Sequence, residues 1–272
     1  MTNFKIFNVF GLIFLFGIFF ITCCKEPEPA PGPEPEEGDG KIILKFDYML
    51  DNQPLEMDTL KYVNEAGNHY EVHDVRYFIS DVTLHKSDGS QKIINEWEDL
   101  HYVDIYIPST QTWEAPDKIT EGTYDYITFT FGLEPDKNIS YRFTNPPESD
   151  MIWAEICGGG YHYLILDGRW VDTTQALEYF AFHLGKSPEY DGLGNLINSY
   201  HNQFTVTLPN SSFTLQKDET KEIQIVMNIE NWFRSPNTYD HNAWGGYIMA
   251  TREAIELGCE NGHDVFTVGY IQ

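Results

Sequence analysis

Basic residues are scarce in this chain of 272 residues. It carries 17 Lys and Arg against 42 Asp and Glu, which gives a formal net charge of −25. A surface of that sign repels nucleic acid and anionic lipid headgroups, so the composition excludes a nucleic-acid partner. The acidity is compatible with cations and cationic partners, but a solvated surface is the favoured explanation.

Cysteine is also scarce, with four residues in all. Two of them, Cys157 and Cys259, lie beyond the N-terminal region, and neither belongs to a C-x-x-C pair. A disulfide between them would close a loop of about 100 residues and stabilise the fold by about 4–5 kcal/mol in the chain-entropy model. The spacing leaves this disulfide and two free thiols equally open, with thiolate ligation of a metal as a third alternative.

Motifs of common enzymes are missing. The sequence has no G-x-S-x-G, no H-E-x-x-H and no P-loop, and no internal repeat is evident. Glu155 and Asp167 are a candidate carboxylate pair for a glycosidase, and six tryptophans are candidates for stacking on sugars. The alternative is that the tryptophans are core or rim aromatics, and we expect a protein without catalysis of its own.

A single long apolar run occurs, at the N-terminus. Residues 6–21 are almost unbroken in apolar character, follow Lys5 and are followed by T-C-C-K-E at residues 22–26. The run is short for a membrane span and fits a secretory signal. A cysteine at its end resembles a bacterial lipoprotein signal over residues 1–24, with Cys24 as the lipidated residue and Cys23 as the alternative. Lys25-Glu26 resembles the signal that sends some lipoproteins to the outer membrane, on the periplasmic or cell-surface side.

The next segment, residues 25–40, reads K-E-P-E-P-A-P-G-P-E-P-E-E-G-D-G. Proline and glutamate at this density bury no core, so we predict an extended tether that holds the folded part away from a membrane. Residues 41–272 then form the folded domain.

Period-two patterns dominate that domain, and aromatic residues make up 15% of the chain, which favours strands. Turn signals separate most of the patterns, and one short helix is expected at Thr251–Gly258. We therefore predict an all-β fold, an antiparallel β-sandwich with one short C-terminal helix. The expected strands are Lys41–Leu50, His69–Leu84, Leu100–Ile107, Tyr124–Gly132, Ala176–Gly185, Tyr200–Leu208 and Glu222–Phe233.

The densest stretch is Met151–Gly168, M-I-W-A-E-I-C-G-G-G-Y-H-Y-L-I-L-D-G. Three consecutive glycines predict a turn with unusual dihedrals or a close approach to the backbone. The alternation after them places His162 on the strand face of Leu164 and Leu166.

Among the nine histidines, His162 and His183 are the candidates of most interest. They lie on aromatic-rich strands that follow one another in the chain, so we expect these strands to pair. His73 lies near another aromatic strand. Two or three convergent imidazoles suit copper or zinc, whereas spacing alone favours core histidines bonded to backbone groups. Surface positions are expected for His69, His85, His201 and His241.

Several segments, in order, resemble the MbnP-like domain family, and the resemblance spans roughly residues 41–270. They are Arg76–Leu84, Thr128–Leu133, Met151–Gly168, Phe182–Gly185, Asn228–Phe233 and Glu260–Val268.

The resemblance implies a secreted or lipid-anchored β-sandwich in which some members bind copper through histidines. His183 and Trp153 match family motif positions, and His162 matches one branch. In some members a di-haem, peroxidase-like partner oxidises a tryptophan to kynurenine, which joins the copper site. At position 155 this chain has Glu where copper-binding members carry a second Trp. We expect copper handling with His162, His183, Trp153 and His73 as site residues. The alternative is a surface lipoprotein that binds glycan or protein partners without metal.

Overall fold

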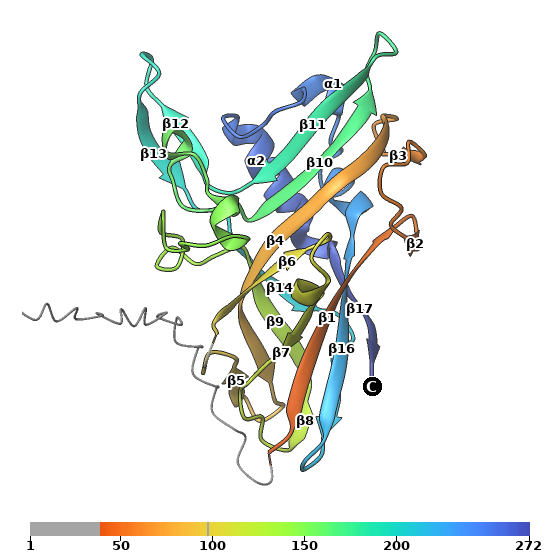
Figure 1. Cartoon of the computed structure of the whole chain (residues 1–272), viewed down its shortest axis with the longest axis vertical. Helices are drawn as coiled ribbons and strands as arrows, with labels where there is room; N and C mark the ends of the chain where they lie inside the picture. The colour runs from red at the N-terminus through yellow and green to blue at the C-terminus, as the bar shows by residue number, and fades with distance from the viewer. Residues whose placement is uncertain (1–38, 97) are drawn as a thin grey trace, which may run out of the picture. The chain divides into compact units, whose positions relative to one another are not determined.

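The computed structural model describes residues 39–96 and 98–272. The expected signal segment 1–24, with Cys23 and Cys24, and the tether up to residue 38 lie outside the described residues. The described part is a β-sandwich, as predicted, in which two sheets face each other across an aromatic core (Figure 1). None of its helices is long and apolar enough to cross a bilayer.

The larger sheet has eight strands, and the long strand β4 runs through its middle. Its main path is β11 (Leu177–Leu184), β10 (Leu164–Val171), β4 (His69–His85), β9 (Tyr126–Phe131) and β14 (Phe204–Leu208). Three short strands also pair with β4, namely β3 (Tyr62–Val63), β5 (Gln91–Ile93) and β6 (Leu100–Asp104).

The smaller sheet has five strands, with β1 between β16 and β2. Its strands are β17 (Phe266–Ile271), β16 (Thr220–Asn228), β1 (Lys41–Leu50), β2 (Gln53–Pro54) and β7 (Thr112–Glu114). Two separate ribbons pair β12 (Ser187–Tyr190) with β13 (Leu196–Tyr200) and β8 (Gly122–Tyr124) with β15 (Phe213–Leu215).

Alternation along the strands builds the core. Every second residue of β1 is buried, from Ile42 to Leu50, and the residues between them are less buried. Across the sandwich, Phe46 and Tyr48 of β1 meet Tyr77 of β4 edge to face, with ring centroids 6.3 Å apart in both pairs. The aromatic residues that make the strands recognisable in the sequence are thus also the contact between the sheets.

One pair of strands departs from the predicted antiparallel arrangement. Strands β1 and β16 run parallel, in register from Lys41 opposite Thr220 to Met49 opposite Asn228. Parallel neighbours need a long connection rather than a hairpin, and here the chain builds the larger sheet before it returns to β16.

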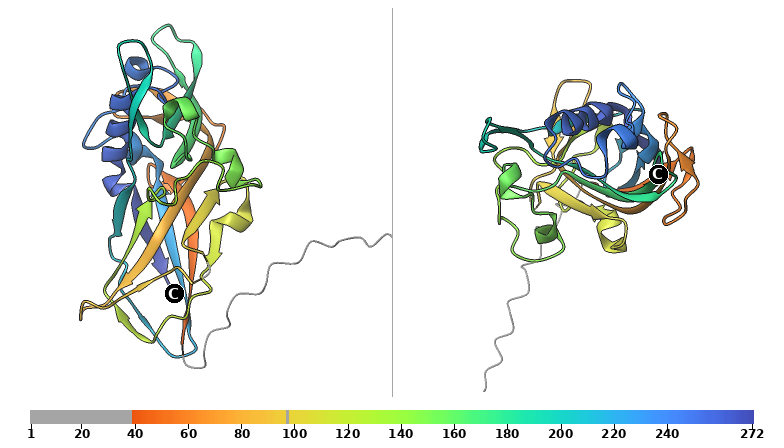
Figure 2. Two further views of the ribbon diagram at one scale, coloured as in Figure 1. Left: turned by 90° about the vertical axis from the view of Figure 1, so that its left-hand side faces the viewer. Right: turned by 90° about the horizontal axis from the view of Figure 1, so that it is seen from above.

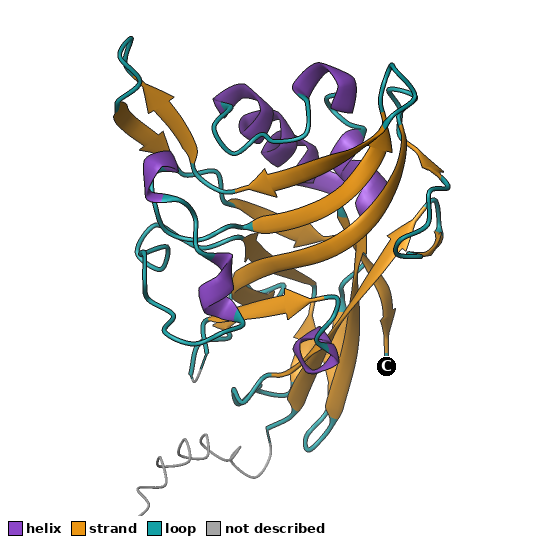
Figure 3. Ribbon diagram, turned by 45° about the horizontal axis from the view of Figure 1, so that its top comes forward, coloured by secondary structure: helices purple, strands orange, loops and turns teal. Residues whose placement is uncertain are grey.

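The helices pack at one end of the larger sheet. Helix α2 (Arg252–Asn261) follows α1 (His241–Trp244), and both lie beside β10 and β11 (Figures 2 and 3). A Cβ at Gly258 would lie 2.7 Å from side-chain atoms of both Phe182 and Leu184. This close approach lets α2 cover the inner face of β11, and the predicted C-terminal helix is confirmed.

Within the described part of the chain, five short 3₁₀ helices lie in the connections. They are η1 (Pro108–Gln111), η2 (Glu148–Met151), η3 (Glu155–Cys157), η4 (Ile229–Phe233) and η5 (Gly262–Asp264).

Several predicted strands were too long. Strand β6 ends at Asp104, because that carboxylate accepts the Tyr106 N–H at 2.7 Å and turns the chain. The pattern expected to run to Phe233 ends at Asn228 and continues as η4. Residues 200–208 divide between β13 and β14, and residues 124–132 between β8 and β9.

The two cysteines of the domain are free thiols in the structure. Cys157 is buried in η3 and Cys259 lies in α2. The disulfide that the sequence left open is therefore not formed, and the free-thiol alternative is the one that the structure has.

Candidate functional site

Three of the predicted site residues converge. The imidazole rings of His162 and His183 are perpendicular, with centroids 4.9 Å apart. The indole of Trp153 meets His162 edge to face at 4.7 Å. The three side chains therefore form a row of edge-to-face contacts in the order Trp153, His162, His183.

The pairing of β10 with β11 positions His183. Ile165 lies opposite His183 and Leu164 opposite Leu184, so the predicted pairing is confirmed. Because Leu184 faces the core, His183 lies on the outer face of the larger sheet.

His162 is placed differently from the prediction. Strand β10 begins only at Leu164, so His162 belongs to the connection before the strand, where its N–H donates to Met151 O at 2.7 Å. The strand alternation does not extend to it, and its ring lies beside His183 instead of on the core face of Leu164.

Hydrogen bonds define the tautomers of the two rings. Nδ1 of His162 lies 2.9 Å from Met151 O, and Nε2 of His183 lies 2.8 Å from Oδ1 of Asp167. A carbonyl and a carboxylate only accept, so each of these ring nitrogens carries the proton. In the neutral rings the other two nitrogens, Nε2 of His162 and Nδ1 of His183, then carry lone pairs.

Those two nitrogens have no protein partner. Both are buried, and no hydrogen bond satisfies either of them. Burial, followed by the nearby His183, lowers the pKa of His162 to about 3, which keeps its ring neutral. A buried polar atom without a partner costs about 1–3 kcal/mol, so two of them, on rings whose centroids lie 4.9 Å apart, make this cluster a candidate ligand site.

The glycine turn brings this segment to the sheet. Gly158, Gly159 and Gly160 have φ of 106°, 62° and 90°. Three successive left-handed residues are accessible to glycine and strained for any other residue. A Cβ at Gly160 would also lie 2.4 Å from Oδ1 of Asn138, so the predicted unusual turn is confirmed together with a close approach.

Asn138 fixes the chain on both sides of His162. Its Oδ1 accepts the Tyr161 N–H at 2.7 Å, and its Nδ2 donates to the Tyr163 hydroxyl at 3.1 Å. The side chain is almost fully buried. Nothing in the local sequence around Asn138 indicates this contact, since its partners lie more than 20 residues away.

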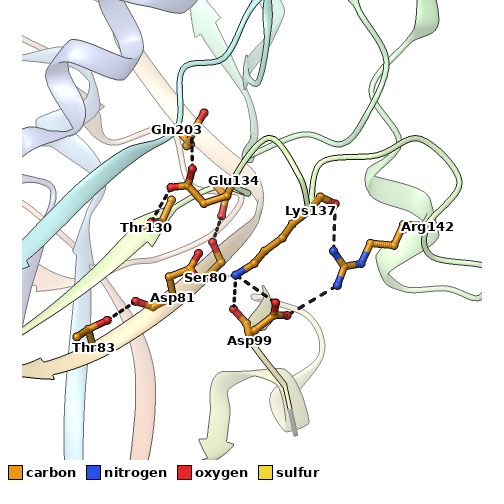
Figure 4. Close-up of polar contacts among 10 residues, drawn as sticks. Ser80, Asp81, Thr83, Asp99, Thr130, Glu134, Lys137, Arg142 and Gln203 are labelled. Carbon is orange, nitrogen blue, oxygen red and sulfur yellow. Dashed lines mark hydrogen bonds and ion pairs between the residues drawn. The ribbon is translucent and has the colours of Figure 1, made fainter. Parts of the chain in front are cut away.

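A lysine anchors the start of the same segment. Lys137 is 8% exposed and forms ion pairs with Asp81 of β4 and, at 3.2 Å, with Asp99 (Figure 4). Arg142 reaches Asp99 and the Lys137 carbonyl (Figure 4). These contacts tie the long connection between β9 and β10, which carries Trp153 and His162, to the central strand β4 and to the residue before β6.

Trp153 supports the histidines by packing. The indole Nε1 donates to Cys157 O at 3.0 Å, and a Cβ at Gly185 would lie 2.9 Å from the ring. Indole nitrogen is a donor without an accepting lone pair. As an unmodified indole, Trp153 therefore packs against the site and is not a metal ligand.

His73 does not join the cluster. Its Nε2 lies 2.9 Å from Oε1 of Glu71, and its Nδ1 lies 3.4 Å from the Tyr179 hydroxyl. The register places Arg76, not His73, level with Ile165 and His183, and three residues of strand correspond to about 10 Å. The prediction of His73 as a fourth site residue does not match this arrangement.

His241 is the clearest error among the predicted surface histidines. It is fully buried within rings of Tyr70, Trp170 and Phe180 and neighbouring aromatics, which approach from distant parts of the chain. His85 is partly buried and bonded to Thr128 at 2.8 Å. His69 and His201 are exposed, as predicted.

The candidate glycosidase carboxylates have different environments. Asp167 accepts from His183, whereas Glu155 is exposed in η3 beside the glycine turn. Asp167 therefore belongs to the histidine cluster, a role that the sequence did not suggest.

Two charged residues near the cluster were not identified from the sequence. Arg76 and Asp74 of β4 form an ion pair of 2.7 Å on the outer face of the sheet, where Asp74 lies opposite Asp167. Burial is the main cause that raises the pKa of Asp74. Their charge within a strand that is largely buried was the available signal.

A set of three protein ligands is not formed here. In residues 39–96 and 98–272, no group of three or more His, Cys, Asp or Glu side chains is arranged to hold a metal ion. The cluster thus offers two imidazole nitrogens, and a bound metal would take its remaining ligands from elsewhere.

Comparisons with known proteins found a family model and a solved structure similar to this chain. The family model MbnP matches residues 39–250. Among solved structures, MbnP from Methylosinus trichosporium has a TM-score of 0.56 at 14% identity, covering 84% of this chain and 98% of that one. At that identity the likeness shows the fold alone. No curated protein matches the sequence.

Proposed function

Since the chain belongs to the MbnP family, we propose that it binds or handles copper as a lipid-anchored, extracytoplasmic protein. The role is binding, with no catalytic step of its own. The signal-like segment 1–24 and the acidic tether support the location, since both are features of exported, anchored proteins.

One observation carries the copper proposal. The buried nitrogens Nε2 of His162 and Nδ1 of His183 lack partners in adjacent rings. Imidazole is a preferred ligand of copper, and both rings have a hydrogen bond at the opposite nitrogen that fixes their orientation. The donor set therefore fits a copper ion held by two histidines, with Trp153 packed against His162.

The di-haem partner that the family resemblance implies belongs to the same proposal. Trp153 is the residue on which such a partner would act. Its indole is fully buried and in contact with His162, so modification of that ring would occur directly beside the proposed copper position.

The test is copper uptake by the purified folded domain. We expect about one copper ion per chain, and His183→Ala should weaken binding at least tenfold because it removes one of two protein ligands. His85→Ala is the matched control, since His85 is a partly buried histidine of the same sheet whose ring is bonded to Thr128. It should bind copper as the wild type does.

Equal affinity of wild type and His183→Ala would contradict the site. A wild-type domain that takes up no copper from a copper-replete medium would contradict the function itself. Binding of glycan or protein partners without metal is the alternative in that case, and an array of glycans is its direct test.

A further inference from the structure

Among the residues that the structure describes, Asp167 is the carboxylate bonded to the histidine pair. Its Oδ1 lies 2.8 Å from Nε2 of His183, and the two side chains are 22% and 15% exposed. They belong to neighbouring strands, with Asp167 opposite Ala181 and Ile165 opposite His183. Paired strands are rigid, so the contact is set by the sheet rather than by a loop.

The two histidines differ in what holds them. His162 donates to a neutral backbone carbonyl, whereas His183 donates to a carboxylate. A carboxylate behind an imidazole fixes the tautomer, makes the opposite nitrogen a better donor to a metal, and places a negative charge near the ion. Of the two histidines, only His183 has a carboxylate behind it and so receives the effect of its charge.

Asp74 is the neighbouring carboxylate and serves another group. It lies opposite Asp167 on the adjacent strand, and its Oδ2 is 2.7 Å from Nη2 of Arg76. The pair offers a natural comparison, because two carboxylates on one face differ in whether they contact a histidine.

From this geometry we propose that Asp167 is a positioning residue with two effects. It directs the metal to Nδ1 of His183 by holding the proton on Nε2, and its charge favours Cu²⁺ over Cu⁺ at the site. The second effect rests on the proposed copper function, whereas the proton on Nε2 that underlies the first is a property of the protein without metal.

The first effect is tested on the metal-free domain. Nitrogen NMR of ¹⁵N-histidine-labelled protein should show His183 with the proton on Nε2, its signal being assigned by its loss in His183→Gln. Asp167→Ala should shift this ring to a mixture of tautomers, and Asp167→Asn, whose side-chain oxygen still accepts, should retain the Nε2 proton. An unchanged His183 signal in Asp167→Ala would overturn the positioning role.

The second effect is tested by copper affinity in both oxidation states. Asp167→Asn should lower the Cu²⁺ affinity about 10- to 100-fold. The Cu⁺ affinity should fall less, because a single positive charge gains less from the carboxylate. The reduction potential of the bound copper therefore rises. Equal losses for the two ions would overturn the charge effect.

Asp74→Asn is the control variant. It removes the same charge from the adjacent strand without touching a histidine, so it should change the Cu²⁺ affinity much less than Asp167→Asn does. Losses of equal size would show a general field rather than a specific contact and would overturn the proposal. A wild-type domain that binds no copper ends the copper function alone, since the NMR result on Asp167 stands separately.

Discussion

At the scale of single residues, histidines have different roles according to what surrounds their rings. His162 and His183 each have one ring nitrogen bonded to an acceptor and one buried ring nitrogen without a hydrogen-bond partner. His241 has two nitrogens without partners inside an aromatic cage. The sequence identified the first two from their aromatic strands. It placed His241 at the surface because its immediate neighbours Asp240 and Asn242 are polar, and the cage comes from elements far away in the chain.

Replacement of His241 by Phe should make the protein more stable in mild acid. Burial lowers the pKa of His241 to about 3, whereas an unfolded histidine titrates near 6.5. Between these values the unfolded chain binds more protons. The free energy of unfolding therefore decreases as the pH falls from about 6.5 toward 3, by about 1.4 kcal/mol per pH unit. Above about pH 6.5 this contribution is absent.

Denaturant unfolding of wild type and His241→Phe at pH 7.5 and 5.0 measures the effect. The wild type should lose about 2 kcal/mol more than the variant between the two pH values. His69→Phe, at an exposed position, should follow the wild type. An identical pH dependence of wild type and His241→Phe would contradict the assignment.

At the scale of elements, the strands were predictable and their junctions were not. The bounds of β1, β4 and β11 agree with the predicted strands to within one residue at each end, because alternation marks a half-buried strand directly. The connection between β9 and β10 was recognisable by its three glycines and the loop of residues 145–148 before them. Its anchors, Lys137 and Asn138, bond residues up to 56 positions away, and such contacts leave no local pattern.

Lys137→Met should destabilise the protein by about 1–3 kcal/mol. The ammonium is nearly buried and pairs with Asp81 and Asp99, whose side chains are 32% and 35% exposed and so regain water when the lysine is lost. The loss is therefore smaller than for a fully buried pair. Copper affinity should fall as well, because the anchored segment carries His162.

Lys41→Met is the matched control. Lys41 pairs with Glu114 at 3.9 Å, with both side chains well exposed, and its loss should cost less than about 0.5 kcal/mol. Thermal or denaturant unfolding of both variants gives the comparison. Equal stability of the two variants would contradict the role of Lys137 as an anchor.

At the scale of the whole molecule, the number and type of the expected strands predicted the sandwich, but they did not predict the order of the strands within each sheet. The parallel pair of β1 and β16 joins the beginning of the domain to its end, and pattern along the chain holds no information about such distant pairing. The same holds for the site. The sequence supplied His162, His183 and Trp153 as candidates, and the geometry assigned Asp167 to them and moved His73 away.

The proposed lipid anchor leads to a prediction about the two N-terminal cysteines. A chain with a net charge of −25 is repelled by anionic headgroups, so the folded domain does not hold itself to such a membrane. Stable anchoring takes more than one acyl chain, at about 0.8 kcal/mol per buried CH₂, and a lipidated N-terminal cysteine supplies them.

In the full-length chain expressed in a Gram-negative host, Cys24→Ser should therefore move the protein from the membrane to the soluble fraction of the envelope. Cys23→Ser should remain membrane-bound, and the mass of the mature wild type should correspond to an acylated chain beginning at Cys24. Release by Cys23→Ser instead would assign the lipid to Cys23, and membrane retention of the double variant would refute lipid anchoring.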